Sequence, residues 1–292
     1  MTLRMHDGRN ITYNVADIDS IVFDDEQEPI FVTTETGLSS EVFSSRVEIP
    51  RLTGDDVLIV HQATDMEGNP VNYSAAYRPE KYHPRWVAYR FDSELSAQNV
   101  SRKSSGERPQ YPTDPLYSEQ PYDDASFQGY DHGHLCASAD RTCSRLCNDQ
   151  TFYMTNMSPM KARFNRYYWT YYESHIQSLA RTEGFADTLY VVKGGTLDDF
   201  PCDTIKVAGR DMPVPGYYFI ALLKVKDGRY SSIGFWMEHK EYESVTDKTE
   251  EIFAHAVTID QLEILTDIDF FHNLPDAVET NAEMTFSREE WE

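Results

Sequence analysis

The chain has 292 residues, of which 40% are hydrophobic and 13% aromatic, which suits one large globular domain with or without a small appendage. It contains no continuous apolar stretch of the length that spans a bilayer, which argues against a transmembrane helix. Its formal net charge of −23 has the wrong sign for a protein that handles polyphosphate, because phosphate binding normally draws on Lys and Arg.

The charge is distributed unevenly along the chain. Residues 125–181 carry six basic and four acidic residues, a net charge of +2, so the remainder carries −25. Acidic residues gather elsewhere, in stretches such as 24–28 and at the C-terminal end, and we interpret those stretches as solvated surface. The local balance within 125–181 therefore leaves room for phosphate binding.

The first 45 residues predict a small β segment followed by a linker. Apolar residues alternate on both sides of Asp7-Gly8, a turn signal. The acidic stretch 24–28 with Pro29 then marks a boundary. Residues 13–21 resemble the segment that follows the anchor in many bacterial surface lipoproteins, and no signal-peptide core precedes them. We therefore expect an extracytoplasmic protein, secreted, periplasmic or lipid-anchored, whose signal has been removed.

Residues 46–292 are predicted to form the main domain. Residues 101–128 are poor in aliphatic side chains and form a long loop, and a loop of that length inside a compact domain is more often functional than idle. Short apolar stretches of strand length lie before and after it: Val57–Val60, Trp86–Tyr89, Leu189–Val192, Tyr217–Leu223 and Ile233–Trp236.

Two helices are predicted among these strands. From Met160 to Gly184 the large apolar residues recur at mainly helical spacing, and Pro159 suits a helix start. Residues 258–265 form a short helix with Thr258 as its N-cap. The pattern predicts an α+β fold with a central antiparallel β-sheet flanked by helices.

Three elements in the middle of the chain form a ββα unit. Asp131-His132-Gly133-His134 ends one short strand, and Phe152–Asn156 is predicted as the second. The helix that carries Asn165 and Glu173 follows. In this order, a His on the first strand can face a polar residue on the helix.

This unit has the groups that phosphodiester hydrolysis needs. An imidazole such as that of His134 can activate water near neutral pH. A cation must neutralise charge on the phosphate, and Mg²⁺ keeps several waters, so the amide oxygen of Asn165 can suffice as its protein ligand. Glu173 lies eight residues on, roughly 12 Å along a helix, so it is placed to orient a metal-bound water rather than to ligate.

These residues resemble the DNA/RNA non-specific endonucleases, which are His-Me finger, or ββα-metal, enzymes. The resemblance runs over about residues 47–275. It rests on three motifs in the same order: Asp131-His132-Gly133-His134-Leu135, Phe152-Tyr153-Met154-Thr155-Asn156-Met157-Ser158-Pro159, and Phe164-Asn165-x3-Trp169-x3-Glu173. It implies a metal-dependent, sugar-non-specific endonuclease that hydrolyses phosphodiester bonds of DNA and RNA.

The resemblance also assigns roles to single residues. It implies that His134 is the general base and that Asn165 binds Mg²⁺, with Mn²⁺ as an alternative ion. The second active-site Asn of the family falls on Asn156, and its helix Glu on Glu173. A phosphate-contacting Arg precedes the motif in the family; Arg102 is the better match.

Arg108 is the alternative to Arg102, because the intervening loop does not align cleanly. Two further positions depart from the family pattern. His132 stands where the family usually has Arg, and either it contacts substrate or the substitution is incidental. Gln177 stands where some members have Arg. Arg163, beside the metal-binding Asn, is a further candidate for contacting substrate.

The sequence is also compatible with two other functions and with several states of the cysteines. A catalytically degenerate member of the same fold would bind nucleic acid or another surface ligand without cutting it, and the acidic charge favours that alternative. An enzyme with a narrower phosphodiester substrate is a third. Four cysteines are compatible with a disulfide, with free thiols or with structural zinc, although their spacing matches no common zinc pattern: Cys136, Cys143, Cys147 and Cys202.

Overall fold

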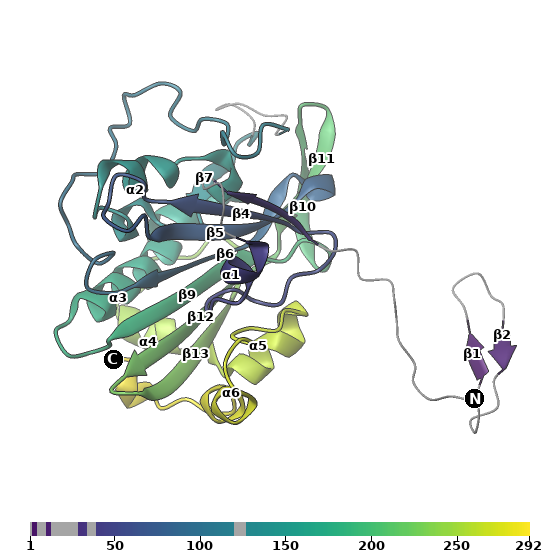
Figure 1. The fold of residues 1–292 in the computed structure, drawn as a ribbon. Coiled ribbons are helices and arrows are strands. Elements are labelled where there is room, and N and C mark those ends of the chain that lie inside the picture. Colours follow the sequence, from purple (N-terminus) through teal and green to yellow (C-terminus); the bar gives the residue numbers. More distant parts are fainter. Residues whose placement is uncertain (1, 5–9, 13–28, 34–38, 120–126) are drawn as a thin grey trace.

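The computed structural model describes residues 2–4, 10–12, 29–33, 39–119 and 127–292 (Figure 1). At the N-terminal end, β1 (Thr2–Arg4) pairs antiparallel with β2 (Asn10–Thr12), as the alternation of apolar residues predicts. The turn at Asp7-Gly8 and the predicted boundary at 24–28 lie outside the described residues.

An eight-stranded sheet forms the centre of the protein, with the order β14-β13-β12-β9-β6-β5-β4-β3. Every pair of neighbours is antiparallel except β3 and β4, which are parallel. The α+β class with a central, mainly antiparallel sheet is therefore confirmed. The strands are β3 (Ile30–Thr33), β4 (Val57–Gln62), β5 (Val71–Arg78), β6 (His83–Phe91), β9 (Thr188–Gly195), β12 (Tyr217–Lys226), β13 (Arg229–Glu238) and β14 (Ala256–Val257).

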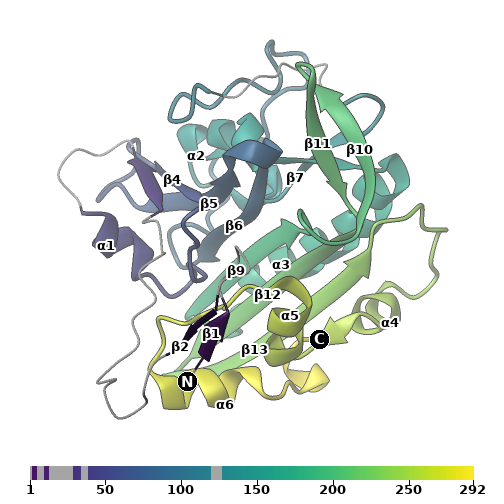
Figure 2. The ribbon, with the colours of Figure 1, turned by 90° about the vertical axis from the view of Figure 1, so that its right-hand side faces the viewer.

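Helices cover both faces of this sheet (Figures 1 and 2). Helices α3 (Thr170–Arg181) and α4 (Lys248–Phe253) pack on one face. Helices α1 (Ser40–Ser44), α5 (Ile259–Thr266) and α6 (Asp276–Glu283) pack on the other. None of the helices in the described part of the chain is both long and apolar enough to cross a membrane.

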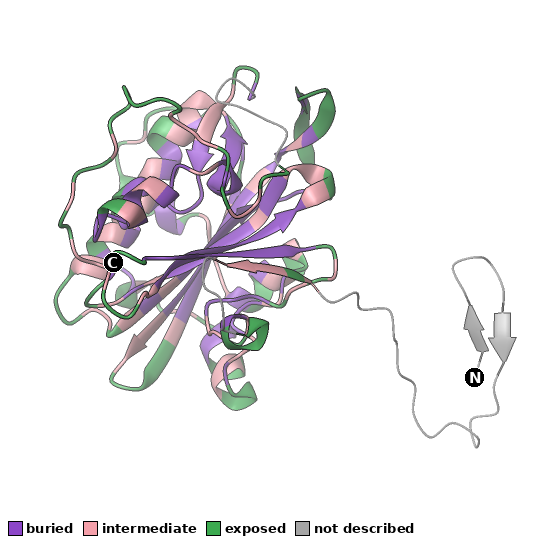
Figure 3. Cartoon of the chain, turned by 45° about the horizontal axis from the view of Figure 1, so that its top comes forward, coloured by how far each residue is buried: buried purple, intermediate pink, exposed green. Residues whose placement is uncertain are grey.

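The two cores arise from the two-residue period of the strands. On β6, Val87 and Tyr89 point into the core beneath α3, whereas Trp86 and Ala88 point into the core beneath α5. Strand β12 alternates in the same way. Burial of one such large apolar side chain contributes about 1.5–3 kcal/mol, and the strands at the centre of the sheet are buried along most of their length (Figure 3).

Smaller elements lie at the edges of this framework. Strand β7 (Asp131–His134) pairs only with β8 (Met157–Met160), and β10 (Pro201–Val207) pairs with β11 (Arg210–Pro215). Helix α2 (Arg145–Gln150) joins β7 to β8. The described part of the predicted loop 101–128 has no helix or strand.

The prediction of a strand over Phe152–Asn156 is wrong. Residues Met154–Asn156 form a 3-10 turn, and the strand that pairs with β7 begins at Met157. The buried side chains of Phe152 and Met154 imitate strand alternation. The main chain turns there because the side chain of Asn156 binds the main chain of Cys136, in place of a strand ladder.

The long helix is confirmed, but its first part is a π-helix over Phe164–Trp169 that runs into α3. Phe164 and Trp169 are both buried, and their spacing of five residues matches the wider π turn. Helix α5 begins as predicted, because Thr258 and Gln261 form a complete capping box.

Two elements from the first 45 residues belong to the large sheet and its core. The apolar stretch Ile30–Thr33 forms β3 beside β4, and Phe43 of α1 is buried with the α5 core. The side-chain amide of Asn273 fastens this region by donating to the carbonyl oxygens of Ser44 and Arg46, each at 2.9 Å.

Candidate active site

The ribbon of β7 and β8 places His134 between the large sheet and the long helix. In its register His134 lies opposite Met157, and Gly133 lies opposite Ser158. A Cβ atom at Gly133 would lie 2.3 Å from the Met160 sulfur, so a larger residue here would force the buried Met160 side chain to move. The indole Nε1 of Trp169 donates to the carbonyl oxygen of His134 at 3.1 Å, which ties the helix to the strand.

The imidazole of His134 is buried, with 9% of the residue exposed. Its ring packs edge-on against Phe152, with centroids 5.0 Å apart, and its Nε2 atom has no hydrogen-bond partner. Burial, followed by the charge of Arg102 and by His132, lowers the pKa of His134 to about 3. The imidazole is therefore neutral at physiological pH, with Nε2 available to accept a proton.

Asn165 is oriented by an acidic residue of the same motif. Its Nδ2 donates to Oδ2 of Asp131 at 3.1 Å, and Arg166 holds both carboxylate oxygens of Asp131 at 2.7 and 2.5 Å. Burial opposes ionisation of Asp131, but the hydrogen bonds from Arg166 and Asn165 outweigh it and lower its pKa. The side-chain amide is planar, with Nδ2 and Oδ1 bonded to the same carbon. The hydrogen bond from Nδ2 therefore also sets the direction in which Oδ1 points.

An oxygen atom on a fixed amide is a ligand that suits a hard cation such as Mg²⁺. The donor chemistry of Asn165 therefore fits a divalent metal. Sequence analysis did not identify Asp131 and Arg166 as the pair that orients this ligand. The signal was present, since Asp131 opens the first motif and Arg166 directly follows Asn165.

Glu173 lies one helical turn beyond Trp169, next to a group of buried charges. Burial raises its pKa to about 7, although Lys193 and Arg102 act in the opposite direction. Lys193 on β9 is fully buried, and its Nζ lies 3.5 Å from Oδ2 of Asp140. Sequence analysis missed Lys193, because it continues the apolar stretch that predicts the strand.

Gln177 completes the environment of Asp140. Its Nε2 donates to Oδ1 of Asp140 at 2.8 Å, and the hydroxyl of Tyr89 donates to Oδ2 at 2.5 Å. Gln177 thus helps to hold the carboxylate that pairs with Lys193.

Asn156 lies in the framework of the site rather than on its surface. It is fully buried, and its Oδ1 accepts from the Cys136 N–H at 2.8 Å. Its Nδ2 donates to the carbonyl oxygens of Cys136 and Thr151 at 2.9 and 2.7 Å. The amide therefore clamps the chain directly after His134, and we assign Asn156 a positioning role.

The candidate substrate-contacting residues lie in different surroundings. Arg102 is exposed, its guanidinium lies 5.4 Å from the centroid of Phe152, and its charge acts on both His134 and Glu173. Arg108 instead donates to the carbonyl oxygens of Ser105 and Glu107 within its own loop. The structure therefore favours Arg102 as the arginine nearest the candidate base.

His132 and Arg163 are both engaged with neighbouring residues. The ring of His132 is stacked between Tyr111 and Phe127, with centroid distances of 4.2 and 4.4 Å. Arg163 donates to the carbonyl oxygen of Tyr242 at 2.8 Å and lies 3.3 Å from a carboxylate oxygen of Glu243. The stacking places the His132 ring between two aromatic side chains, and a contact with substrate stays a prediction.

All four cysteines are free thiols in the structure. Cys143 and Cys147 lie close together at the start of α2, where a hydrogen bond to Cys147 lowers the pKa of Cys143 to about 7. Cys136 is fully buried directly after His134 and Leu135.

The clamp formed by Asn156 gives a testable expectation. Asn156→Ala would leave three buried main-chain groups without their partner, and each such group costs about 1–3 kcal/mol. We expect the free energy of unfolding, measured by urea denaturation, to fall by at least about 2 kcal/mol. Asn165→Ala, which removes a single side-chain hydrogen bond at a half-buried position, is the matched control and should change stability far less. An Asn156→Ala protein of unchanged stability would contradict the positioning role.

The sequence and the fold are similar to those of known nucleases. The family described as DNA/RNA non-specific endonuclease matches residues 54–277. Nuclease C1 of Cunninghamella echinulata var. echinulata is 30% identical over 159 residues, which cover 52% of this chain and 60% of that protein. Mitochondrial endonuclease G of Caenorhabditis elegans is 29% identical over 160 residues, covering 52% and 50%. A nuclease of Nostoc sp. (strain PCC 7120 / SAG 25.82 / UTEX 2576) is 28% identical over 249 residues, 80% of each chain.

Among solved structures, a chain in the EndoG/EndoGI complex superposes with a TM-score of 0.64 and 20% identity, covering 84% of this chain and 96% of that one. This likeness establishes a shared fold. The chain spans about half to three fifths of the length of the first relatives named above. Because the family match covers most of the chain and includes all three motifs, the protein belongs to the DNA/RNA non-specific endonuclease family.

Proposed function

We propose that the protein is a metal-dependent nuclease that hydrolyses phosphodiester bonds of DNA and RNA. The observation that carries the proposal is the neutral imidazole of His134, buried beside Arg102 with an unpartnered Nε2. Leaving a buried polar atom without a partner costs free energy, and such atoms are uncommon unless they serve a purpose. Family membership supports the same reaction class.

His134 acts as the general base in this proposal. Its Nε2 accepts the proton of the water that attacks phosphorus, and the imidazole becomes positively charged. The peptide carbonyl of His134 stays bound to the Trp169 indole, so the strand does not shift as the ring gains charge. The negative charge that develops on the phosphate then lies near a new cation and the guanidinium of Arg102.

Asn165 would hold the divalent ion, with Asp131 and Arg166 keeping its amide in place. When bound, Mg²⁺ or Mn²⁺ would supply positive charge to the phosphate and stabilise the departing oxygen. Glu173 of α3, whose carboxyl group interacts with the charge of Arg102, would add negative charge that favours the cation once it is ionised.

Substrate recognition should run through phosphates rather than base edges, because the cation on the exposed surface beside His134 is the guanidinium of Arg102. The overall charge of −23 repels nucleic acid, so the attraction is local and sensitive to salt. Such contacts carry no sequence preference and suit both DNA and RNA.

The central test is digestion of supercoiled plasmid and of RNA at low salt with Mg²⁺. We expect cutting by the wild type, and we expect EDTA to abolish it. His134→Ala and Asn165→Ala should each lower the rate by at least about 100-fold, the scale of a general base or a metal ligand. If the wild type cuts neither substrate, with Mg²⁺ or with Mn²⁺, the proposal of a nuclease is contradicted and a non-catalytic binding protein is favoured.

Arg102 and Arg108 form a matched pair of variants within one loop. Arg102→Ala should raise KM for a DNA substrate several-fold and reduce the dependence of binding on salt, because one phosphate contact is lost. Arg108→Ala should leave both unchanged, since its guanidinium binds carbonyl groups of its own loop. The opposite ranking of the two variants would assign the phosphate contact to Arg108.

The pH profile should be governed by Glu173 rather than by His134. His134 has a lowered pKa, so its neutral form persists until the pH approaches about 3. Glu173 has a raised pKa and loses its charge as the pH falls through about 7. We therefore expect kcat/KM to fall below pH 7 in the wild type and to be lower but nearly level from pH 8 to pH 5.5 in Glu173→Gln. If kcat/KM of this variant still fell near pH 6.5, the pH dependence would be assigned to protonation of His134 instead.

A further inference from the structure

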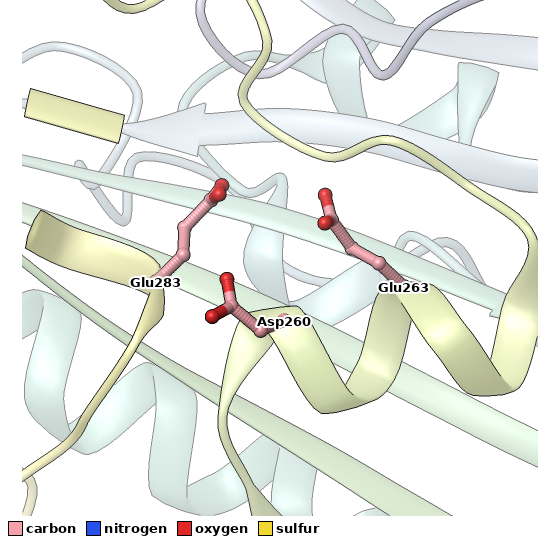
Figure 4. Close-up of side chains that lie close together, drawn as sticks. All are labelled: Asp260, Glu263 and Glu283. Atoms are coloured by element: carbon pink, nitrogen blue, oxygen red, sulfur yellow. The ribbon is translucent and has the colours of Figure 1, made fainter. Parts of the chain in front are cut away.

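A second group of acidic side chains lies on the face of the large sheet opposite to His134. Asp260 and Glu263 stand on α5, and Glu283 is the last residue of α6. One carboxylate oxygen from each residue lies within 4.8 Å of the other two. Figure 4 shows the three carboxyl groups turned toward one space between the two helices.

Glu283 is the unusual member of this group. Only 4% of the residue is exposed, and its Oε1 is buried without a hydrogen-bond partner. The large sheet fixes the main chain just before Glu283, because the hydroxyl of Ser232 on β13 donates to the carbonyl oxygen of Ala282 at 2.6 Å. The ionised form of a carboxyl group is costly at such a buried position, and a cation bonded to Oε1 would stabilise that form.

Two described cations, Arg51 and Arg85, line a cavity beside Glu263 but pair with Asp269 and Asp56 instead. In the part of the chain that the structure describes, no Lys or Arg forms an ion pair with any of them. Burial first, and then Glu263 and further acidic neighbours, raise the pKa of Glu283 to about 9. Glu263 has a pKa raised to about 7 for the same reasons, although the Phe270 N–H donates to its Oε1 at 2.8 Å.

We propose that Asp260, Glu263 and Glu283 bind a hard divalent cation of the Ca²⁺ type, at a site separate from the one that contains Asn165. Ca²⁺ bonds oxygen ligands at roughly 2.3–2.6 Å, so ligands on opposite sides of the ion lie up to about 5 Å apart. The spacing of the three oxygens fits inside that shell. Three carboxylates offer up to six oxygens, and water reaches the site from the exposed side, at Asp260.

The ligand set favours Ca²⁺ over Mg²⁺. Mg²⁺ dehydrates reluctantly and is usually held by one or two carboxylates, whereas Ca²⁺ accepts a larger number of protein oxygens in a flexible geometry. The bound ion would connect the start of α5 to the end of α6 and so fasten the C-terminal helix to the sheet. This role is structural and does not depend on nuclease activity.

The test is a calcium titration of EDTA-treated, dialysed protein by calorimetry, with thermal unfolding in parallel. Asn165→Ala serves as the parent, so that the proposed catalytic ion does not contribute. We expect one Ca²⁺ per chain and a Tm that rises with Ca²⁺ concentration, because an ion that binds only the folded state stabilises it.

Glu283→Gln in the same background should lose the binding heat and the rise in Tm, because it keeps the shape of the side chain but removes the charge. Asp260→Asn, at an exposed position, should weaken binding at least tenfold and provides a variant whose folding is not in question. Glu289→Gln removes an exposed charge of the same type and should behave as the parent. The proposal would be overturned if the parent bound no Ca²⁺, or if the parent and Glu283→Gln responded equally. The three side chains would then be carboxyl groups that are partly protonated and bind no cation.

Discussion

The antiparallel pairing of β7 with β8 is the constraint on which the site depends. The ribbon pairs with no strand of the eight-stranded sheet, but hydrogen bonds join β8 to that sheet, from His83 to the Ser158 hydroxyl at 2.7 Å and from the Tyr218 hydroxyl to the Pro159 carbonyl oxygen at 3.0 Å. The Asn156 amide clamps the chain after His134, and the Trp169 indole binds the carbonyl of His134 itself. Both contacts are to main-chain atoms, and they leave the imidazole without any partner at Nε2. The fold thus holds the backbone of the proposed base in place and leaves its Nε2 atom unengaged.

Charged side chains are distributed unevenly between the two faces of the sheet. On the α3 face, the buried cations Lys193 and Arg141 lie near the site, and Arg141 also donates to the carbonyl oxygens of Asn72 and Arg90. The opposite face carries the acidic group on α5 and α6. The chain as a whole carries −23, so the charge beside the site differs from the average over the chain.

The sequence allowed the strands, the capped helix α5 and the order of the ββα unit to be predicted, since each follows from local periodicity or capping chemistry. The strand predicted at Phe152–Asn156 does not form, because the side chain of Asn156 bonds the main chain of Cys136 where strand pairing was expected. Such a long-range hydrogen bond leaves no periodic pattern in the sequence. Lys193 and Glu283 were missed for a related reason. Each is a single charged residue whose burial is decided by elements distant in the sequence.

The two proposed sites share one physical feature, a buried side-chain atom that the protein itself does not satisfy. His134 Nε2 and Glu283 Oε1 both belong to this class. The indole nitrogen of Trp86 does too, but its cost is offset by the apolar surface of a large buried ring. Glu283 has no comparable apolar surface, and the neutral ring of His134 could be replaced by an apolar side chain at a gain in stability. In the two proposals, a water molecule would bond His134 Nε2 and a cation would bond Glu283 Oε1, so that each buried atom gains a partner when its ligand is bound.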